Sequence, residues 1–145
     1  MHQRKPLGLT PSAANRLPTT QGSRELSIAD GSSSRSVCLD LAEQHLRAAG
    51  MRILNRNWRR RYGTLDMVVA DQAVTVFVEI QTPRATVGGA RPVQISRDRK
   101  DRLRRMALLW LVEQSGPRRK IRFDVVSVMV DPGHSPTVVH VQAAF

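Results

Sequence analysis

The sequence predicts a single α/β domain in which helices flank a mixed β-sheet, with the element order α-β-β-β-α-β-β. Its length of 145 residues and hydrophobic fraction of 41% suit one domain with a packed core. Two segments carry apolar residues at the three- and four-residue spacing of a helix, and five others are short strand-like runs, four of which are rich in β-branched residues. No segment repeats another, so the order of these elements defines the fold class.

Residues 1–34 predict a disordered leader, because Pro6, Pro11 and Pro18 interrupt a stretch that has no sustained periodicity. The folded domain is expected over residues 35–145. It retains 19 basic and 10 acidic residues of the 23 and 12 in the chain, so a net charge of +9 belongs to the domain. A charge of this size favours a polyanionic partner, most often nucleic acid, with an acidic membrane surface as the competing partner.

Two helices and five strands account for the domain. The first helix is expected over residues 36–50, with Gly50 as its C-terminal cap. The second is expected over residues 93–114, where Gly116 and Pro117 stop it. The strands are expected over residues 51–57, 65–71, 74–80, 121–130 and 137–142, the last of them at a sheet edge.

The sequence favours a cytoplasmic protein without a membrane partner. Cys38 is the single cysteine, which excludes an intramolecular disulfide and a cysteine-based zinc site. The longest apolar run, MALLWLV at residues 106–112, is too short to span a bilayer. The N-terminus lacks the apolar centre of a secretory signal.

Two isolated acids, Asp66 and Glu79, stand inside otherwise apolar strands. If the break between these strands is a two-residue hairpin loop at Gln72-Ala73, antiparallel pairing places Asp66 opposite Glu79 on one face. Gln81 shares that face, because strand side chains alternate with a period of two. A three-residue loop would change this register.

Two facing carboxylates repel each other unless a proton, an arginine or a divalent cation compensates their charge. Magnesium takes one or two carboxylates together with water and phosphate oxygens, which suits phosphodiester hydrolysis beside a basic surface. Asp66 and Glu79 are therefore candidate ligands for magnesium or manganese. The alternative is structural, with each acid paired to an arginine of the basic face.

From about residue 37 to the end, the chain resembles the YraN family of bacterial proteins. The resemblance follows AEQHLRAAGMRILNRNWRRRYGTLDMVVA, then VFVEIQT, the basic helix RKDRLRRMALLWL, RFDVVSV and the closing HVQAAF. It implies a restriction-endonuclease-like fold with a PD-(D/E)xK motif, similar to archaeal Holliday-junction resolvases, and DNA as the partner. Resolvase-like folds often work as homodimers, although the residues themselves add no interface signal.

The chain departs from the family pattern beside the two acids. Asp66 and Glu79 fall on the motif acids, but Gln81 stands at the lysine position and Thr64 at the preceding glutamate. The first-helix glutamate falls at Leu39. Glutamine is neutral and cannot supply the charge of the lysine, so a weakened catalytic set of Asp66, Glu79 and Gln81 is implied. Candidate substitutes are Arg60, Arg84 or Lys100 for the lysine, and Asp40 or Glu43 for the glutamate.

Two basic clusters are candidates for nucleic-acid contact. Arg97, Lys100 and Arg104 fall on one face of the second helix, and guanidinium groups bind phosphate in a bidentate manner. The second cluster lies between two aromatic residues, an arrangement that suits base stacking and phosphate contact. It consists of Arg59, Arg60 and Arg61 between Trp58 and Tyr62. The plainer interpretations are a solvated helix face for the first cluster, and core aromatics beside a charged turn for the second.

Three functions follow from these observations. The first is a nucleic-acid-binding protein of endonuclease-like fold with a degenerate metal-dependent phosphodiesterase site. The second is an active magnesium- or manganese-dependent endonuclease on branched or flapped DNA. The third is a basic adaptor for RNA or a protein partner that uses the edge strand at residues 137–142.

Overall fold

The computed structural model describes residues 31–83 and 94–145, with only the backbone for 31–33. The chain divides into two units, Met1–Ser34 and Arg35–Phe145. The predicted leader, apart from its last four residues, and the candidate Arg84 lie outside the described residues. Those last four residues are helical rather than disordered, because the first helix begins at Gly31 and not at Ser36.

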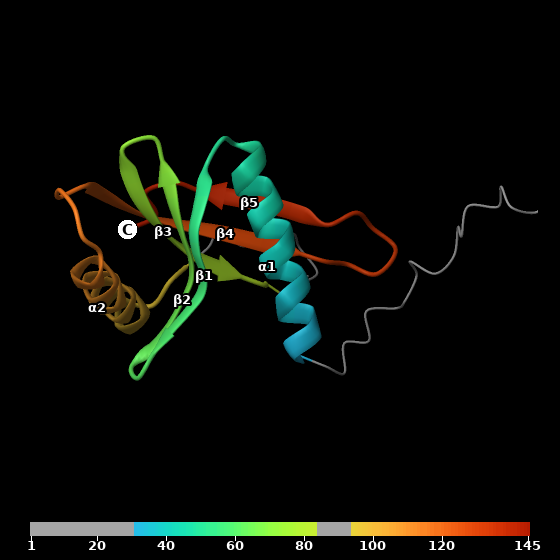
Figure 1. The fold of residues 1–145 in the computed structure, drawn as a ribbon. Helices are drawn as coiled ribbons and strands as arrows, with labels where there is room; N and C mark the ends of the chain where they lie inside the picture. Colours follow the sequence, from blue (N-terminus) through green and yellow to red (C-terminus); the bar gives the residue numbers. More distant parts are fainter. Residues whose placement is uncertain (1–30, 84–93) are drawn as a thin grey trace, which may run out of the picture. The chain divides into compact units, whose positions relative to one another are not determined.

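The structure confirms the element order α-β-β-β-α-β-β (Figure 1). The second helix begins later than expected, because the Ser96 side chain accepts a hydrogen bond from the Arg99 N–H at 3.3 Å and caps its first turn. The elements are α1 (Gly31–Ala48), β1 (Arg52–Arg60), β2 (Gly63–Asp71), β3 (Val74–Gln81), α2 (Arg97–Glu113), β4 (Lys120–Met129) and β5 (Thr137–Val141).

The five strands form one mixed sheet in the order β1-β2-β3-β4-β5. Strands β3 and β4 are parallel and joined through α2, whereas the other neighbours are antiparallel. Asp71 pairs with Val74, which confirms the two-residue loop between β2 and β3. Gln72 accommodates this turn with a left-handed φ of 53°. Strand β5 lies at one edge of the sheet, as predicted, and β1 lies at the other edge.

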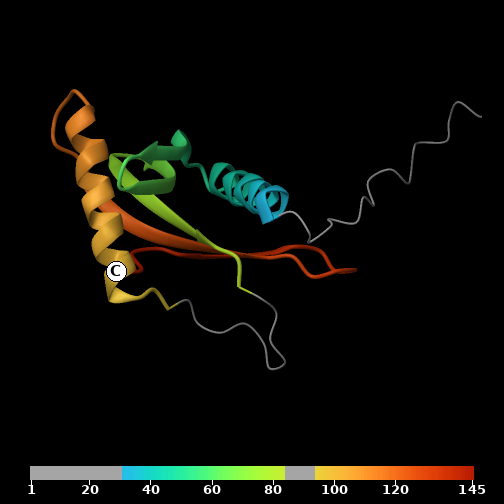
Figure 2. The same cartoon turned by 90° about the horizontal axis from the view of Figure 1, so that it is seen from below.

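The two helices pack on opposite faces of the sheet. Alternate residues of β3 divide between two apolar clusters, as the two-residue period requires. Val76 and Val78 pack with Leu46 of α1, whereas Phe77 packs with Met106 and Trp110 of α2. Figure 2 shows the helices well apart, with strands between them. Each helix therefore covers its own half of the core.

A polar cluster lies in the α1-side half of the sheet. Asp124 of β4 is fully buried and accepts hydrogen bonds from Arg122 at 2.8 Å, His140 at 2.8 Å and the Ala143 N–H at 3.0 Å. Arg122 also reaches Asp71 at 3.1 Å. Burial raises the pKa of Asp124, but the bonds from His140, Arg122 and Ala143 outweigh it and lower the pKa from 3.8 to about 2.

We predict that Asp124→Asn lowers the free energy of unfolding by about 1–3 kcal/mol, because it removes the buried charge that Arg122 and His140 contact and leaves Arg122 paired with Asp71 alone. In the wild type, the stability contributed by the depressed pKa is complete above pH ~4 and is lost as the pH falls toward ~2, a loss on the order of 2 kcal/mol. Urea denaturation across this pH range measures both effects.

The matched control for this substitution is Asp131→Asn. Asp131 lies after β4, and its side chain forms no ion pair among residues 31–83 and 94–145. Equal stability losses in the two variants would contradict the role assigned to Asp124.

Candidate functional site

Asp66 of β2 and Glu79 of β3 come together in a hollow of about 310 Å³. Both residues are buried, with 5% and 4% of their surface exposed. The remaining wall of the hollow is basic or uncharged and is formed by Arg35, Gly63, Thr64, Arg99, Arg102 and Leu103. The expected convergence of the two acids beside guanidinium groups is therefore observed, although their roles as metal ligands stay a prediction.

Asp66 does not simply extend the hairpin ladder as expected. The paired register of β2 and β3 stops at Met67 and Val78, one step before the two acids. There the Ile80 N–H donates to Asp66 Oδ2 at 2.8 Å, so a side-chain carboxylate satisfies a buried main-chain donor. Arg35 of α1 pairs with the other oxygen, Oδ1. Both oxygens of Asp66 therefore have partners within the protein.

Glu79 is held from the opposite helix. Arg99, in the first turn of α2, forms an ion pair with Glu79 Oε1 across 20 residues of sequence. The arginine side chain is 46% exposed, whereas that of Glu79 is 4% exposed, so the cation lies between the acid and solvent. With Arg102 on the same wall, three arginines and two acidic residues line the hollow. The hollow therefore carries a net positive charge.

Gln81 is half-buried at the end of β3 and does not line the hollow. In the parallel pair of β3 and β4 it lies beside Ser127. The Ser127 hydroxyl is buried and has no hydrogen-bond partner in the part of the chain that the structure describes. A catalytic role for Gln81 stays a prediction, at a position outside the lining of the hollow.

The cluster at the β1–β2 turn serves two purposes. Trp58 is 8% exposed and belongs to the α2-side core, which confirms the plainer interpretation for that residue. Arg60 lies over the Trp58 ring at 4.2 Å and pairs with Glu113 of α2 at 2.6 Å. Tyr62 is 70% exposed, with Arg61 near its ring at 5.7 Å. Arg59 is exposed beside Asn57, so this turn offers Tyr62 and two arginines to solvent.

The predicted basic row of α2 lies beside the last residue of the chain. Arg97 is exposed at the start of the helix. Lys100 and Arg104 lie 5.8 Å and 5.5 Å from the centre of the Phe145 ring, and Arg104 also pairs with Asp101 at 3.4 Å. The row is therefore basic and accessible. Within residues 31–83 and 94–145, Arg97 is the one member of the row that has neither a cation–π contact nor an ion pair.

The proposed substitutes for the missing family residues lie elsewhere. Asp40 and Glu43 both pair with Arg56, at 2.6 Å and 2.8 Å, on the exposed side of α1, and neither lines the hollow. Arg60 and Lys100 are absent from the same wall. The cations at the acids are Arg35, Arg99 and Arg102, which the sequence analysis did not select, because nothing local links them to residues 66 and 79.

A magnesium or manganese ion would find only a minimal donor set here. Across residues 31–83 and 94–145, no three His, Cys, Asp or Glu side chains converge to hold a metal. Two carboxylates meet the lower requirement of magnesium, which keeps water and substrate phosphate as its other ligands. The residues thus fit such an ion, but only if it displaces Arg35 or Arg99 from the acids.

The fold and the hollow define a basic, mixed α/β protein with two buried acids, each of which is paired with an arginine. A family model, "Uncharacterised protein family UPF0102", matches residues 40–128. The chain is 49% identical over 106 residues to a UPF0102 protein of Nocardia farcinica, covering 73% of this chain and 84% of the relative. It is 41% identical over 106 residues to one from Rhodococcus opacus, covering 73% and 90%. The chain belongs to the UPF0102 family, which confirms the YraN resemblance.

We predict that Arg99→Ala lowers the free energy of unfolding by about 1–3 kcal/mol, because it leaves the buried Glu79 carboxylate unpaired. In a Glu79→Gln background the same substitution costs less, and the coupling between the two positions is at least about 1 kcal/mol. Urea denaturation of the four proteins in this cycle measures the coupling. The control is Arg97→Ala, two residues earlier on α2, and a coupling near zero would show that the pair is not formed.

Proposed function

We propose that this protein binds nucleic acid through its phosphate backbone, and that arginines rather than a metal ion neutralise the paired acids. The proposal rests on the two ion pairs at the hollow, Arg35 with Asp66 and Arg99 with Glu79. Arg102 lines the same hollow as a third cation. Guanidinium groups stay charged at all physiological pH values and hold phosphate in a bidentate manner. Arg102 is exposed and is the cation of this hollow that pairs with neither acid.

The surface around the hollow supports a contact longer than one phosphate. Arg97 begins α2 two residues before Arg99, and the β1–β2 turn carries Arg61 and the exposed Tyr62 just before Gly63 of the hollow wall. Arginines give sequence-independent phosphate contacts, while an exposed tyrosine ring offers a face on which a base can stack. Together they suit single-stranded or distorted DNA, where unstacked bases are available.

We predict that affinity for a labelled single-stranded DNA falls about 50-fold between 50 and 200 mM salt, because neutralising roughly four phosphates releases their counterions. Arg102→Gln reduces the slope of log Kd against log salt by the amount expected for the loss of about one phosphate contact. Fluorescence anisotropy measures both, with and without EDTA, and metal removal leaves the affinity unchanged.

Arg47→Gln is the matched control. Arg47 lies in the last turn of α1, at the other end of the helix from Arg35, and it does not line the hollow. Its loss removes the same charge and should leave the salt slope as in the wild type. A flat salt response in the wild type would rule out backbone binding, and binding abolished by EDTA would contradict the metal-independent mechanism.

A second candidate function is a magnesium- or manganese-dependent endonuclease acting on branched or flapped DNA. The observation in its favour is that Asp66 and Glu79 project into one hollow instead of onto opposite faces of the sheet. When bound, the metal would activate water and polarise the phosphate. Asp66 and Glu79 would hold it, Arg35 and Arg99 would turn from the acids toward the phosphate, and Gln81 would orient a substrate oxygen or water.

For this second candidate, we predict that any cleavage of junction or flap DNA requires magnesium or manganese and disappears in both Asp66→Ala and Glu79→Ala. Gln81→Lys raises the cleavage rate about tenfold or more, since it restores a cation beside the developing phosphate charge. Gel assays on junction, flap and linear duplex substrates measure these rates. Cleavage that survives both alanine substitutions would belong to a contaminant and would remove support for this function.

Several expectations about context remain predictions. Among residues 31–83 and 94–145, no helix combines the length and apolarity needed to cross a bilayer. The restriction-endonuclease-like fold, a preference for DNA over RNA, a homodimer and a cytoplasmic location are parts of the same proposal. Strand β5 is a sheet edge, as the adaptor hypothesis requires, but the acids at the hollow favour a nucleic-acid role over that alternative.

A further inference from the structure

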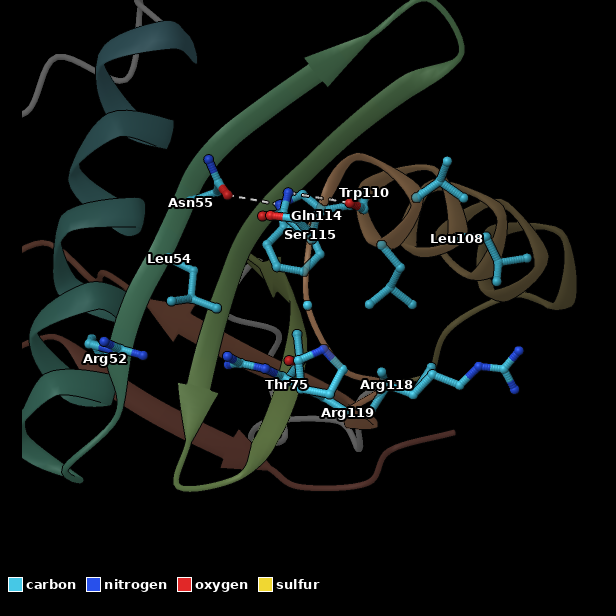
Figure 3. Close-up of a pocket in the computed structure, with 15 residues that line it drawn as sticks. Arg52, Leu54, Asn55, Thr75, Leu108, Trp110, Gln114, Ser115, Arg118 and Arg119 are labelled. Carbon is cyan, nitrogen blue, oxygen red and sulfur yellow. Dashed lines mark hydrogen bonds between the residues drawn. The ribbon is translucent and has the colours of Figure 1, made fainter.

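A second concave site, separate from the acid hollow, lies at the C-terminal half of α2. It is a groove of about 670 Å³ that shares no lining residue with the hollow. Figure 3 shows Leu108 and Trp110 of α2 on one wall, Leu54 and Asn55 of β1 on another, and Arg118 and Arg119 of the following segment at its border. The volume is within the range of pockets that hold peptide side chains or small ligands.

The groove exposes large aliphatic side chains. Leu108 is 61% exposed, Val112 is 83% exposed and Ile121 is 42% exposed, and all three line the groove. Single exposed apolar residues are ordinary, but several gathered in one depression mark an interaction site. Their positions on α2 and at the start of β4 leave them outside both core clusters, so packing within residues 31–83 and 94–145 does not account for them.

Every charged residue that lines the groove is an arginine. Arg52, Arg118 and Arg119 are exposed, and none of them forms an ion pair within the described residues. By contrast, Arg35 and Arg99 at the acid hollow are both paired with buried acids. Unpaired guanidinium groups around an apolar depression are complementary to a ligand that carries carboxylates beside bulky apolar groups.

We propose that this groove binds an acidic peptide segment that alternates carboxylates with large aliphatic or aromatic side chains. A nucleic acid fits less well, because the groove offers no exposed aromatic face for base stacking. Its one aromatic residue, Trp110, is 5% exposed and donates its indole N–H to Asn55 Oδ1 at 2.8 Å. Aliphatic side chains at the walls instead suit apolar peptide side chains, and the arginines suit the carboxylates between them. The protein would then hold DNA and an acidic partner at opposite ends of α2.

The direct test is fluorescence anisotropy with the full chain and a labelled decapeptide of alternating aspartate and leucine. Two control peptides separate the contributions, one with serine in place of leucine and one with lysine in place of aspartate. We expect both controls to bind about tenfold or more weakly than the aspartate–leucine peptide, because each removes one half of the complementarity. Equal binding of the aspartate–serine peptide would reduce the groove to a nonspecific basic surface and overturn the proposal.

Substitutions in the groove locate the binding. Leu108→Ser and Arg118→Glu each weaken the aspartate–leucine peptide by about tenfold or more. The matched controls are Leu109→Ser and Arg105→Glu, which alter exposed residues of α2 that do not line the groove. Because Leu108 is itself exposed, the variant should fold as the wild type does, and urea denaturation verifies this. Equal losses in the groove and control variants would overturn the assignment.

Three further measurements distinguish other occupants. Single-stranded DNA should bind Leu108→Ser as tightly as the wild type, so a loss of DNA affinity would assign the groove to nucleic acid instead. Sedimentation equilibrium of the wild type and Val112→Asp tests a second copy of the chain, because a self-association removed by this substitution would identify a dimer interface. Capture by phosphatidylglycerol vesicles that fails in Leu108→Ser would identify a lipid surface. Any of these three outcomes would overturn the peptide proposal.

Discussion

Two buried carboxylates at one end of the β2–β3 hairpin impose the main constraint on this structure. An unpaired buried charge costs several kcal/mol, so each acid needs a cation within the protein or from outside. Asp66 takes its cation from α1 and Glu79 from the first turn of α2. The contacts that satisfy the acids therefore also hold the starts of both helices against the sheet. Stability and the candidate site depend on the same two ion pairs.

An arginine and a divalent metal meet the same electrostatic need, but they support different chemistry. A metal brings ordered water and can activate it, whereas a guanidinium group cannot be deprotonated and only binds and orients. With Gln81 at the lysine position and guanidinium groups on both acids, the hollow is better suited to holding a phosphate than to cleaving it. The Asp124 cluster has no such ambiguity, because its partners enclose the carboxylate completely.

Helix α2 lines two concave surfaces along its length, the acid hollow and the aliphatic groove. Its first turns carry Arg99 and Arg102 toward the acid hollow, and its last turns carry Leu108 and Val112 toward the aliphatic groove. The buried stripe of Leu103, Met106 and Trp110 fixes the rotation of the helix and so decides what each exposed side presents. One helix thereby connects the proposed phosphate-binding surface with the proposed peptide-binding surface.

The element order, the two-residue β2–β3 turn with its register, and the convergence of Asp66 and Glu79 on one site were all predictable from the sequence. These depend on local periodicity and on a two-residue turn, which neighbouring residues encode. Which cations reach the acids could not be predicted from the sequence and depends on long-range packing, because Arg35 and Asp66 are 31 residues apart and Arg99 and Glu79 are 20 apart. The tertiary structure also decided that Trp58 is core and Leu108 is not, since the rotation of each element against the sheet is set by packing across the whole domain.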